Sequence, residues 1–455
     1  MIAVANIYQQ WKDYLEQPVS IAPLITFRIA FGLLMLFSTT RYMWFGWVDS
    51  QLVDPVLHFS YYGFDWVQPL SRVGMYTVFI LMSLACIAIT LGWFYRVATV
   101  LFFFLFTYVE LIDITYYLNH YYFVSLVAFW MIWVPANRYF SLDLLRKPEL
   151  YQMTVSRWCI GIFKLQIAIV YIYAGLAKLN YDWLFRALPL AIWLPARTSV
   201  PVIGFIFKYK ITAYLFSWMG MLFDTFIIGA LLYKPTRWLA YIAVVIFHTL
   251  TGILFQIGIF PLVMIFAVTL FFSDQLHQRF LDQLAKIFSR KTISPKLTAP
   301  HPKPAANRFL IPLVTVFFLF QLVFPWRYLL YPGNLFWTEE GYRFSWRVML
   351  MEKAGTATFY VKDEKSGRKG SVINHQFLND HQEKQMAMQP DLILQYAHYL
   401  KEHYAEKGVI NPSVTAEVWV TLNGRPARLM IDPEVDLTQK ADSWAKKDWI
   451  LPFNE

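Results

Sequence analysis

Long apolar stretches dominate the first three quarters of the chain. Each is about as long as the roughly 17–25 residues that a helix needs to cross a bilayer, and short polar segments separate them. Residues 238–272 are too long for one helix and contain Gln256 and Gly258, which predict a tight reversal. We therefore predict nine transmembrane helices, give or take one, at 21–43, 73–93, 97–116, 120–136, 157–178, 212–233, 238–256, 257–272 and 309–331.

The pattern changes after Tyr331, where 32 of the remaining 124 residues are charged. Between the alternating runs, Gln382–Glu406 has helical spacing that predicts one or two helices interrupted at Pro390. Asn423-Gly424 separates the last two runs and predicts a hairpin turn. The alternating runs predict strands at Thr356–Lys362, Gly370–Asn374, Glu417–Leu422 and Ala427–Ile431.

These patterns predict an α-helical polytopic membrane protein with a C-terminal α+β domain. The predicted transmembrane domain is 1–331 and the predicted α+β domain is 332–455. A composition of 57% hydrophobic and only 15% charged residues excludes a soluble single-domain enzyme and a disordered protein. Residues 291–307, rich in Pro, Lys and Ala, predict an extended linker. Met1–Ser20 lacks the short apolar core and cleavage site of a signal peptide.

The charge distribution predicts an orientation in the membrane. Residues 1–331 carry a net charge of +12 and residues 332–455 a net charge of −2, so the basic excess lies in the membrane part and argues against nucleic-acid binding. With the N-terminus inside, the cytoplasmic segments hold fifteen basic residues and the outer segments seven. Because Lys and Arg are retained on the cytoplasmic side, the C-terminal domain is predicted to be extracytoplasmic.

Ionisable residues inside predicted spans are candidates for function, because burying a charge in a bilayer is costly. The alternative is that they pair with one another across the bundle and fix the packing of the helices, and we favour this for all of them except His248. For His248, the commoner alternative is a buried imidazole that hydrogen-bonds a carbonyl oxygen. The residues are Arg28, Glu110, Asp113, Lys164, Asp224 and His248.

Lys178 ends the predicted span 157–178, at its outer boundary. Its stem can lie along the apolar helix end while the ammonium reaches the lipid headgroups. The functional alternative is a desolvated lysine, because burial disfavours the ammonium form and leaves an amine that can act as a base near neutral pH. Such an amine could deprotonate a phenol-like group.

His120 begins the span 120–136, on the same outer side as Lys178. Its position is compatible with an interfacial aromatic belt and equally with a functional site. No His, Cys or Asp pattern has the spacing of zinc ligands, and there is neither a glycine-rich phosphate loop nor an exposed serine nucleophile motif, so we expect no metal or nucleotide dependence. The residues alone therefore predict a membrane enzyme or carrier with a Lys/His site at the outer leaflet.

The chain also resembles a known family, the vitamin K-dependent γ-glutamyl carboxylases and their bacterial relatives, which share a horizontally transferred transmembrane domain. The resemblance covers nearly the whole chain in order. The matching stretches are Tyr95-Arg96, Leu118–Tyr122, Ala136–Asp143, Ala174–Leu179 with Asp182-Trp183, Phe247-His248, Leu254–Gly258, Gly341–Met349, Glu417–Val420 and Ile431–Asp436.

The resemblance implies that Lys178 is the base that deprotonates a reduced naphthoquinone, such as menaquinol or phylloquinol. Reaction with O2 then yields a base strong enough to remove a γ-proton from a glutamyl side chain, CO2 adds to the carbanion, and the quinone leaves as its epoxide. His120 is implied to support the carbanion step. Four further residues are implied to bind the cofactor: Asn119, His248, Trp346 and Met349.

The departures from the animal enzymes limit what the resemblance implies. Ala177 stands where they have a second lysine, their disulfide has no counterpart, and they extend beyond the point that matches Glu455 to hold a propeptide, so we do not expect propeptide recognition. We expect a carboxylase-like enzyme of a bacterial inner membrane that acts on a glutamate-containing peptide or protein. The alternatives are a quinol epoxidase with a non-glutamyl acceptor, and a non-enzymatic quinone-binding carrier or sensor.

Overall fold

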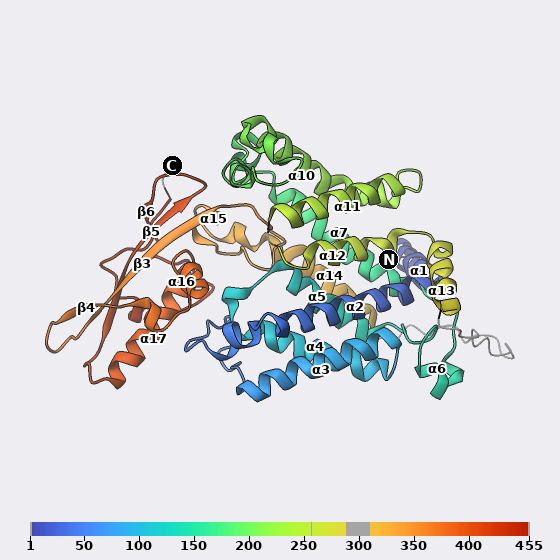
Figure 1. The fold of residues 1–455 in the computed structure, drawn as a ribbon, viewed down its shortest axis with the longest axis horizontal. Helices are drawn as coiled ribbons and strands as arrows, with labels where there is room; N and C mark the ends of the chain where they lie inside the picture. Colours follow the sequence, from blue (N-terminus) through green and yellow to red (C-terminus); the bar gives the residue numbers. More distant parts are fainter. Residues whose placement is uncertain (1, 256, 288–309, 454–455) are drawn as a thin grey trace.

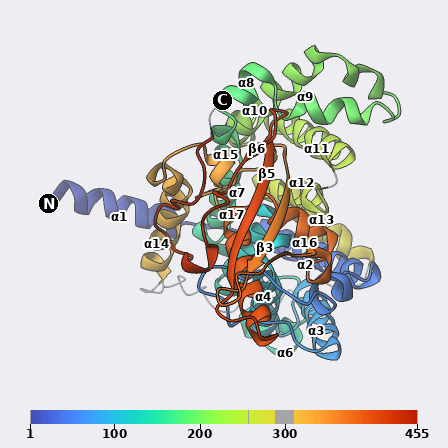
Figure 2. The same cartoon turned by 90° about the vertical axis from the view of Figure 1, so that its left-hand side faces the viewer.

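The computed structural model describes residues 2–255, 257–287 and 310–453. The helical part forms an elongated bundle, and the strands gather at one end of it (Figure 1). Turning the molecule by 90° shows β3 and β5 side by side over this end (Figure 2). The long helices are α1 (Ile2–Glu16), α2 (Ala22–Trp44), α3 (Arg72–Leu91), α4 (Tyr95–Ile112), α5 (Asn119–Trp133), α7 (Trp158–Ala177), α10 (Lys210–Leu232), α11 (Arg237–Leu254), α12 (Phe260–Val268), α13 (Asp274–Ile287) and α14 (Leu310–Val323).

Short helices complete this part of the chain. A strand pair that precedes α2 and α7, β1 (Pro18–Ser20) with β2 (Thr154–Ser156), is antiparallel and ties their starts together. The short α-helices are α6 (Asp143–Arg146), α8 (Tyr181–Arg186), α9 (Leu190–Trp193) and α15 (Leu335–Thr338). Single 3-10 or π turns occur at Val48–Val53, Ile114–Tyr116, Pro148–Leu150, Leu194–Arg197, Gly204–Lys208, Thr269–Phe271, Phe324–Leu330, Asn374–Gln376 and Leu437–Gln439.

Within the described residues, seven helices are long and apolar enough to cross a membrane, or eight if a bent pair counts as one span. They correspond to seven of the nine predicted spans, and the chain is a polytopic membrane protein. The bent pair is Phe260–Phe271 with Asp274–Ile287, which meet at 115°. The predicted reversal before it is confirmed by the turn between α11 and α12, where Gly258 has φ +63°.

The prediction of a full span at 120–136 is wrong in length. Helix α5 has 15 residues, which rise about 22 Å, against a hydrocarbon core of about 30 Å. The helix stops at Trp133 because Val134 precedes Pro135, and a residue before proline is pushed out of the helical region. The predicted span 257–272 is likewise broken, since α12 has only nine residues.

The C-terminal region combines an antiparallel sheet with two helices. The strands are β3 (Lys353–Lys362), β4 (Lys369–Ser371), β5 (Ser413–Leu422) and β6 (Arg428–Leu429), in the order β4-β3-β5-β6. All four predicted strands are found, although β4 ends at Ser371 because Asn374 begins a 3-10 turn. Asn423 and Gly424 have φ +50° and +71°, as the predicted hairpin turn requires.

The predicted helical segment is two helices, α16 (Asp380–Met386) and α17 (Pro390–Glu406). Asn379 caps α16 through a capping box with Gln382, and Pro390 is the first residue of α17, where its missing N–H is no loss. The interruption at Pro390 is therefore confirmed. The predicted linker 291–307 lies outside the described residues.

Two loops of the helical part enter the core of the C-terminal region. Phe59, Tyr61 and Ile114 are buried together with Trp337, Phe359 and the residues of α17. In return, Trp346 is buried in the core of the helical bundle. The segment that joins α15 to β3 thus lies between the two parts, and the candidate site lies beside it.

Candidate functional site

Lys178 is buried in an apolar cavity at the end of α7. The side chain is 6% exposed, and its Nζ donates to Asp224 Oδ2 at 2.6 Å and to the Ala174 carbonyl at 3.2 Å. The indole of Trp183 lies 5.3 Å from Nζ. Since Nζ points inward to a carboxylate, the headgroup alternative for Lys178 does not describe this structure.

Close packing of α7 and α10 brings Lys178 and Asp224 together. A Cβ on Gly175 would lie 2.5 Å from Thr225 Oγ1 and 2.8 Å from its backbone nitrogen, so only glycine fits at this contact. One residue before Thr225, Asp224 projects from α10 to the end of α7. Small residues permit such close approach of membrane helices.

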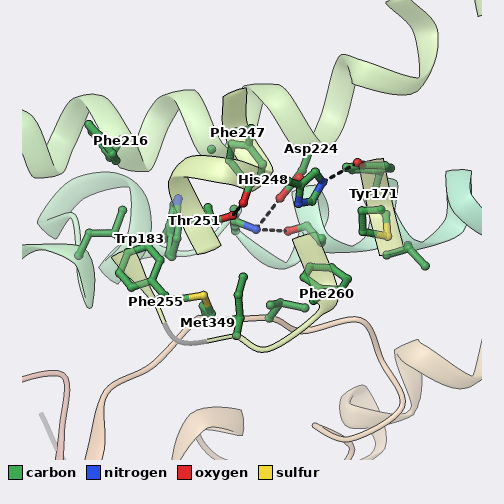
Figure 3. Close-up of a pocket in the computed structure, with 18 residues that line it drawn as sticks. Tyr171, Trp183, Phe216, Asp224, Phe247, His248, Thr251, Phe255, Phe260 and Met349 are labelled. Carbon is green, nitrogen blue, oxygen red and sulfur yellow. Dashed lines mark hydrogen bonds and ion pairs between the residues drawn. The ribbon is translucent and has the colours of Figure 1, made fainter. Parts of the chain in front are cut away.

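Asp224 belongs to the site, and the sequence analysis left it out of the site residues. Its carboxylate is 5% exposed and reaches the cavity beside His248 (Figure 3). The signal was present in the sequence, as an acidic residue within a predicted span. Nothing in the spacing, however, distinguished it from Glu110 or Asp113.

His248 projects from α11 into the same cavity. Its Nε2 lies 2.7 Å from the Tyr171 hydroxyl, and the side chain is 2% exposed (Figure 3). The other ring nitrogen, Nδ1, has no hydrogen-bond partner among the described residues. The imidazole therefore contacts a phenol and not the carbonyl oxygen that the sequence made the commoner expectation.

The cavity around these groups is mainly apolar. Its empty volume, including its open mouth, is about 770 Å³. The rings and thioether of its wall suit a flat apolar molecule, and Lys178 and Asp224 form the polar end. The aromatic and sulfur-containing wall residues are Trp183, Phe216, Phe247, Phe255, Phe260, Met264 and Met349.

His120 and Asn119 lie in a second, neighbouring cavity of about 1180 Å³. His120 is 5% exposed, and its Nε2 has no hydrogen-bond partner within the described ranges. The ring of Phe260 stands between the two histidines, with its centroid 5.6 Å from that of His120 and 5.7 Å from that of His248. The two histidines therefore face two cavities that share a wall.

The shared wall comes from two segments, the turn before α12 and the loop before β3. It is made of Ile257, Phe260, Val348 and Met349. Asn119 holds the loop in place, because its Nδ2 donates to the Arg347 carbonyl at 2.9 Å and its Oδ1 accepts from the Tyr117 hydroxyl at 3.0 Å.

Trp346 and Met349 occupy different places in this loop. Met349 is in the wall of both cavities, whereas Trp346 lines neither and stacks on Tyr122 at 5.0 Å. Phe344, Trp346 and Met349 all have left-handed backbone angles, with φ between +55° and +59°. Side chains other than glycine are strained in this conformation, so surrounding contacts hold the loop in one shape.

The charged candidates other than Asp224 do not line the Lys178 cavity. Arg28 donates to the carbonyls of Ala136 and Phe140 at 2.7 Å each, and Lys164 lies 5.6 Å from the Phe271 ring. Asp113 lies 3.5 Å from His58 Nδ1 and accepts from Gln382 Nε2 at 2.8 Å. Of the six predicted candidates, Asp224 pairs with the oppositely charged Lys178, and Glu110 forms no ion pair or side-chain hydrogen bond within the described part of the chain.

A metal site is not found among the residues that the structure describes, since no three His, Cys, Asp or Glu side chains converge. A buried amine paired with a carboxylate can take a proton from an acidic hydroxyl, and the surrounding apolar wall excludes water. The cavity therefore fits a flat aromatic molecule that carries such a hydroxyl.

Comparisons with known families agree with this arrangement of two parts. A family model of the HTTM domain matches residues 16–275, and a model of the vitamin K-dependent gamma-carboxylase lumenal domain matches residues 306–455. No solved structure matches the chain.

Proposed function

The chain belongs to the vitamin K-dependent gamma-carboxylase family, and from that premise we propose that it couples oxidation of a reduced naphthoquinone to carboxylation of glutamyl side chains. The observation that carries the proposal is the Lys178–Asp224 pair at the polar end of an apolar cavity. The co-substrates are then menaquinol or phylloquinol, O2 and CO2, and the acceptor is a glutamate-containing peptide or protein.

A reduced naphthoquinone, when bound, would supply a phenol-like hydroxyl and four electrons to O2, so that one oxygen atom ends in the quinone epoxide and the other in water, while CO2 is added to the acceptor. Lys178 Nζ, as the amine, accepts the proton of that hydroxyl. The carboxylate of Asp224 then neutralises the ammonium at 2.6 Å. Without this partner, a charged lysine in an apolar cavity would be strongly disfavoured.

The remaining residues of the two cavities bind the substrates and exclude water. His248 and its Tyr171 partner face the cavity beside the pair, and Met349 and Phe260 close it on the side of the second cavity. His120 faces the second cavity, where it stabilises the acceptor carbanion that proton removal leaves. Exclusion of water by this apolar wall protects a strong base, which water would otherwise quench.

The membrane supplies one substrate, and the aqueous side supplies the other. A lipid-soluble quinol reaches the apolar cavity from the bilayer. We propose a bacterial inner membrane with the N-terminus in the cytoplasm, so that the C-terminal region of residues 332–455 meets the peptide acceptor outside.

The test is formation of quinone epoxide by purified protein given chemically reduced vitamin K, O2, bicarbonate and a small glutamyl peptide. Wild type should form epoxide, and Lys178→Ala should form none while its melting temperature stays close to that of wild type. The matched control is Lys210→Ala, an exposed lysine at the start of α10, which should retain full turnover.

Three results would contradict the proposal. Equal epoxide formation by Lys178→Ala and wild type would remove Lys178 from the chemistry. Bound quinol that yields no epoxide with wild type would favour a carrier or sensor. Epoxide without a mass increase of 44 Da per CO2 on the peptide would instead indicate a non-glutamyl acceptor.

A further inference from the structure

The second cavity contains two arginines that have no acidic partner. Arg41, near the end of α2, and Arg347, in the loop before β3, both line it. Neither guanidinium forms an ion pair with a carboxylate among the described residues, and the Nε of each is buried without a hydrogen-bond partner. No Asp or Glu is among the residues that line this cavity.

Aromatic rings hold both guanidinium groups in position. Arg41 Cζ lies 5.0 Å from the Trp47 ring centroid, and Arg347 Cζ lies 4.3 Å from that of Tyr328. Stacking of this kind orients a guanidinium and leaves most of its N–H groups able to donate, and Arg347 also bonds the Tyr328 hydroxyl. The positive charge is thus fixed in place and not neutralised.

Arg41 and His120 converge on one small space beside Gly258. A Cβ at Gly258 would lie 3.7 Å from Arg41 Nη2 and 3.8 Å from His120 Nε2. Since glycine has no Cβ, and its φ of +63° disfavours any other residue, this space stays open between the two donors. An unpartnered imidazole nitrogen and a guanidinium therefore face the same volume.

Both arginines are half-buried, with their Nε atoms out of contact with solvent. A partly buried guanidinium without a counter-ion is disfavoured, and a carboxylate is the group that best compensates it. We propose that the second cavity binds the acceptor through its side-chain carboxylate, which Arg41 and Arg347 hold, on the opposite side of Phe260 from Lys178. This inference rests on the proposed function, and it names the acceptor class: an anionic carboxylate side chain, in preference to its neutral amide.

The arrangement separates the two substrates by one aromatic ring. The quinol occupies the apolar cavity and the acceptor occupies the cationic one, with Phe260 and Met349 between them. His120 lies on the acceptor side, next to Arg41. Fixing the carboxylate at the arginines therefore leaves the adjacent carbons of the side chain near the shared wall.

Peptide binding tests the inference without any turnover. Full-length protein in detergent is titrated calorimetrically with a short glutamyl peptide that has blocked ends, and with the same peptide carrying glutamine. Wild type should bind the glutamyl peptide at least about tenfold more tightly than the glutaminyl peptide. Arg41→Gln and Arg347→Gln should each weaken binding of the glutamyl peptide about tenfold or more and leave the glutaminyl peptide unchanged.

Matched variants exclude general damage. Arg368→Gln removes an exposed arginine in the C-terminal region and should bind like wild type. Arg41→Lys and Arg347→Lys keep the charge and should recover part of the affinity, because lysine binds as a point charge without the fork. If a glutamine variant does not fold, its lysine variant and the salt dependence of wild-type binding carry the test.

Several outcomes would overturn the inference: equal binding of the two peptides by wild type, wild-type affinity in both glutamine variants, or binding of bicarbonate with no binding of the glutamyl peptide. The last would assign the cavity to the one-carbon anion. Epoxide formation by the same preparations distinguishes the two proposals, because selective carboxylate binding without epoxide contradicts only the proposed function, and epoxide without selective binding contradicts only this inference.

Discussion

At the scale of single residues, the chemistry of Lys178 depends on what lies within a few ångströms of its amine. Nζ is 2.6 Å from Asp224 Oδ2 and 5.3 Å from the Trp183 ring. The sequence predicted a buried lysine with functional potential, yet its partner lies 46 residues away on another helix. That distance along the chain is why the partner escaped prediction.

Replacing Asp224 by Asn should lower epoxide turnover about tenfold to a hundredfold. The amide has nearly the same size but cannot neutralise an ammonium at Lys178, so proton transfer to the amine becomes less favourable. Turnover and melting temperature are measured together. Asp282→Asn, an exposed aspartate on α13, serves as the control, and unchanged turnover in a folded Asp224→Asn protein would contradict the role.

Trp346 and Met349 should behave differently when replaced. Met349→Ala opens the wall of both cavities and should raise the KM for the quinol about threefold to tenfold. Trp346→Phe should leave that KM unchanged and lower the free energy of unfolding by about 1 kcal/mol, since Trp346 is 1% exposed and only packs. Steady-state kinetics and thermal melts decide, and the reverse result would place Trp346 against the cofactor.

At the scale of elements, one hairpin turn joins the sheet to the helical part. Arg425, just after the Asn423-Gly424 turn, donates to both carboxylate oxygens of Asp182, at 2.7 Å and 2.8 Å. Asn423 Nδ2 donates to the same carboxylate at 2.8 Å. The sequence predicted the conformation of this turn, but it did not predict the contact of the turn with Asp182.

Asp182→Asn should lower the free energy of unfolding by about 2 kcal/mol at pH 7. Burial alone would raise the pKa of Asp182, but the hydrogen bonds from Arg425 and Asn423 and the charge of Arg425 hold it below its usual value. A lowered folded pKa stabilises the protein above about pH 4 and loses this effect as the pH falls through the folded value.

Thermal melts at pH 7 and at pH 3–4 check the Asp182 prediction. The difference between wild type and Asp182→Asn should be largest at pH 7 and should shrink in acid. Glu402→Gln, which changes an exposed acidic residue on α17, should melt like wild type at both pH values. A difference that grows in acid would contradict the assignment.

At the scale of the whole molecule, the basic residues predict a single orientation in the membrane. Cys86 and Cys159 are both buried, so cysteines introduced at the surface can be labelled selectively. Lys365→Cys, in the exposed turn after β3, should react with an impermeant maleimide in intact cells. Gln275→Cys, exposed on α13, should react only after permeabilisation.

The opposite labelling pattern would reverse the orientation. Permeabilised cells provide the control, because both introduced cysteines should react there. Wild type should stay unlabelled in both conditions, since its own cysteines are buried.

The sequence by itself determined the class of fold, because local patterns carry that information. Apolar length decides which helices can span, Asn423-Gly424 decides a turn, and Pro390 decides where α17 begins. The prediction of full-length spans was wrong at α5 and α12, where apolar length alone was not enough. Pro135 and the bend after Phe271 shorten these helices.

Only the tertiary structure decided how the candidate residues are grouped. Gly175 lets α7 and α10 approach, and this pairs Lys178 with Asp224. Phe260 separates His120 from His248, and the loop before β3 places Met349 in the shared wall while Trp346 faces the core. Contacts between residues far apart in the chain depend on helix packing, and neither spacing nor composition encodes packing directly.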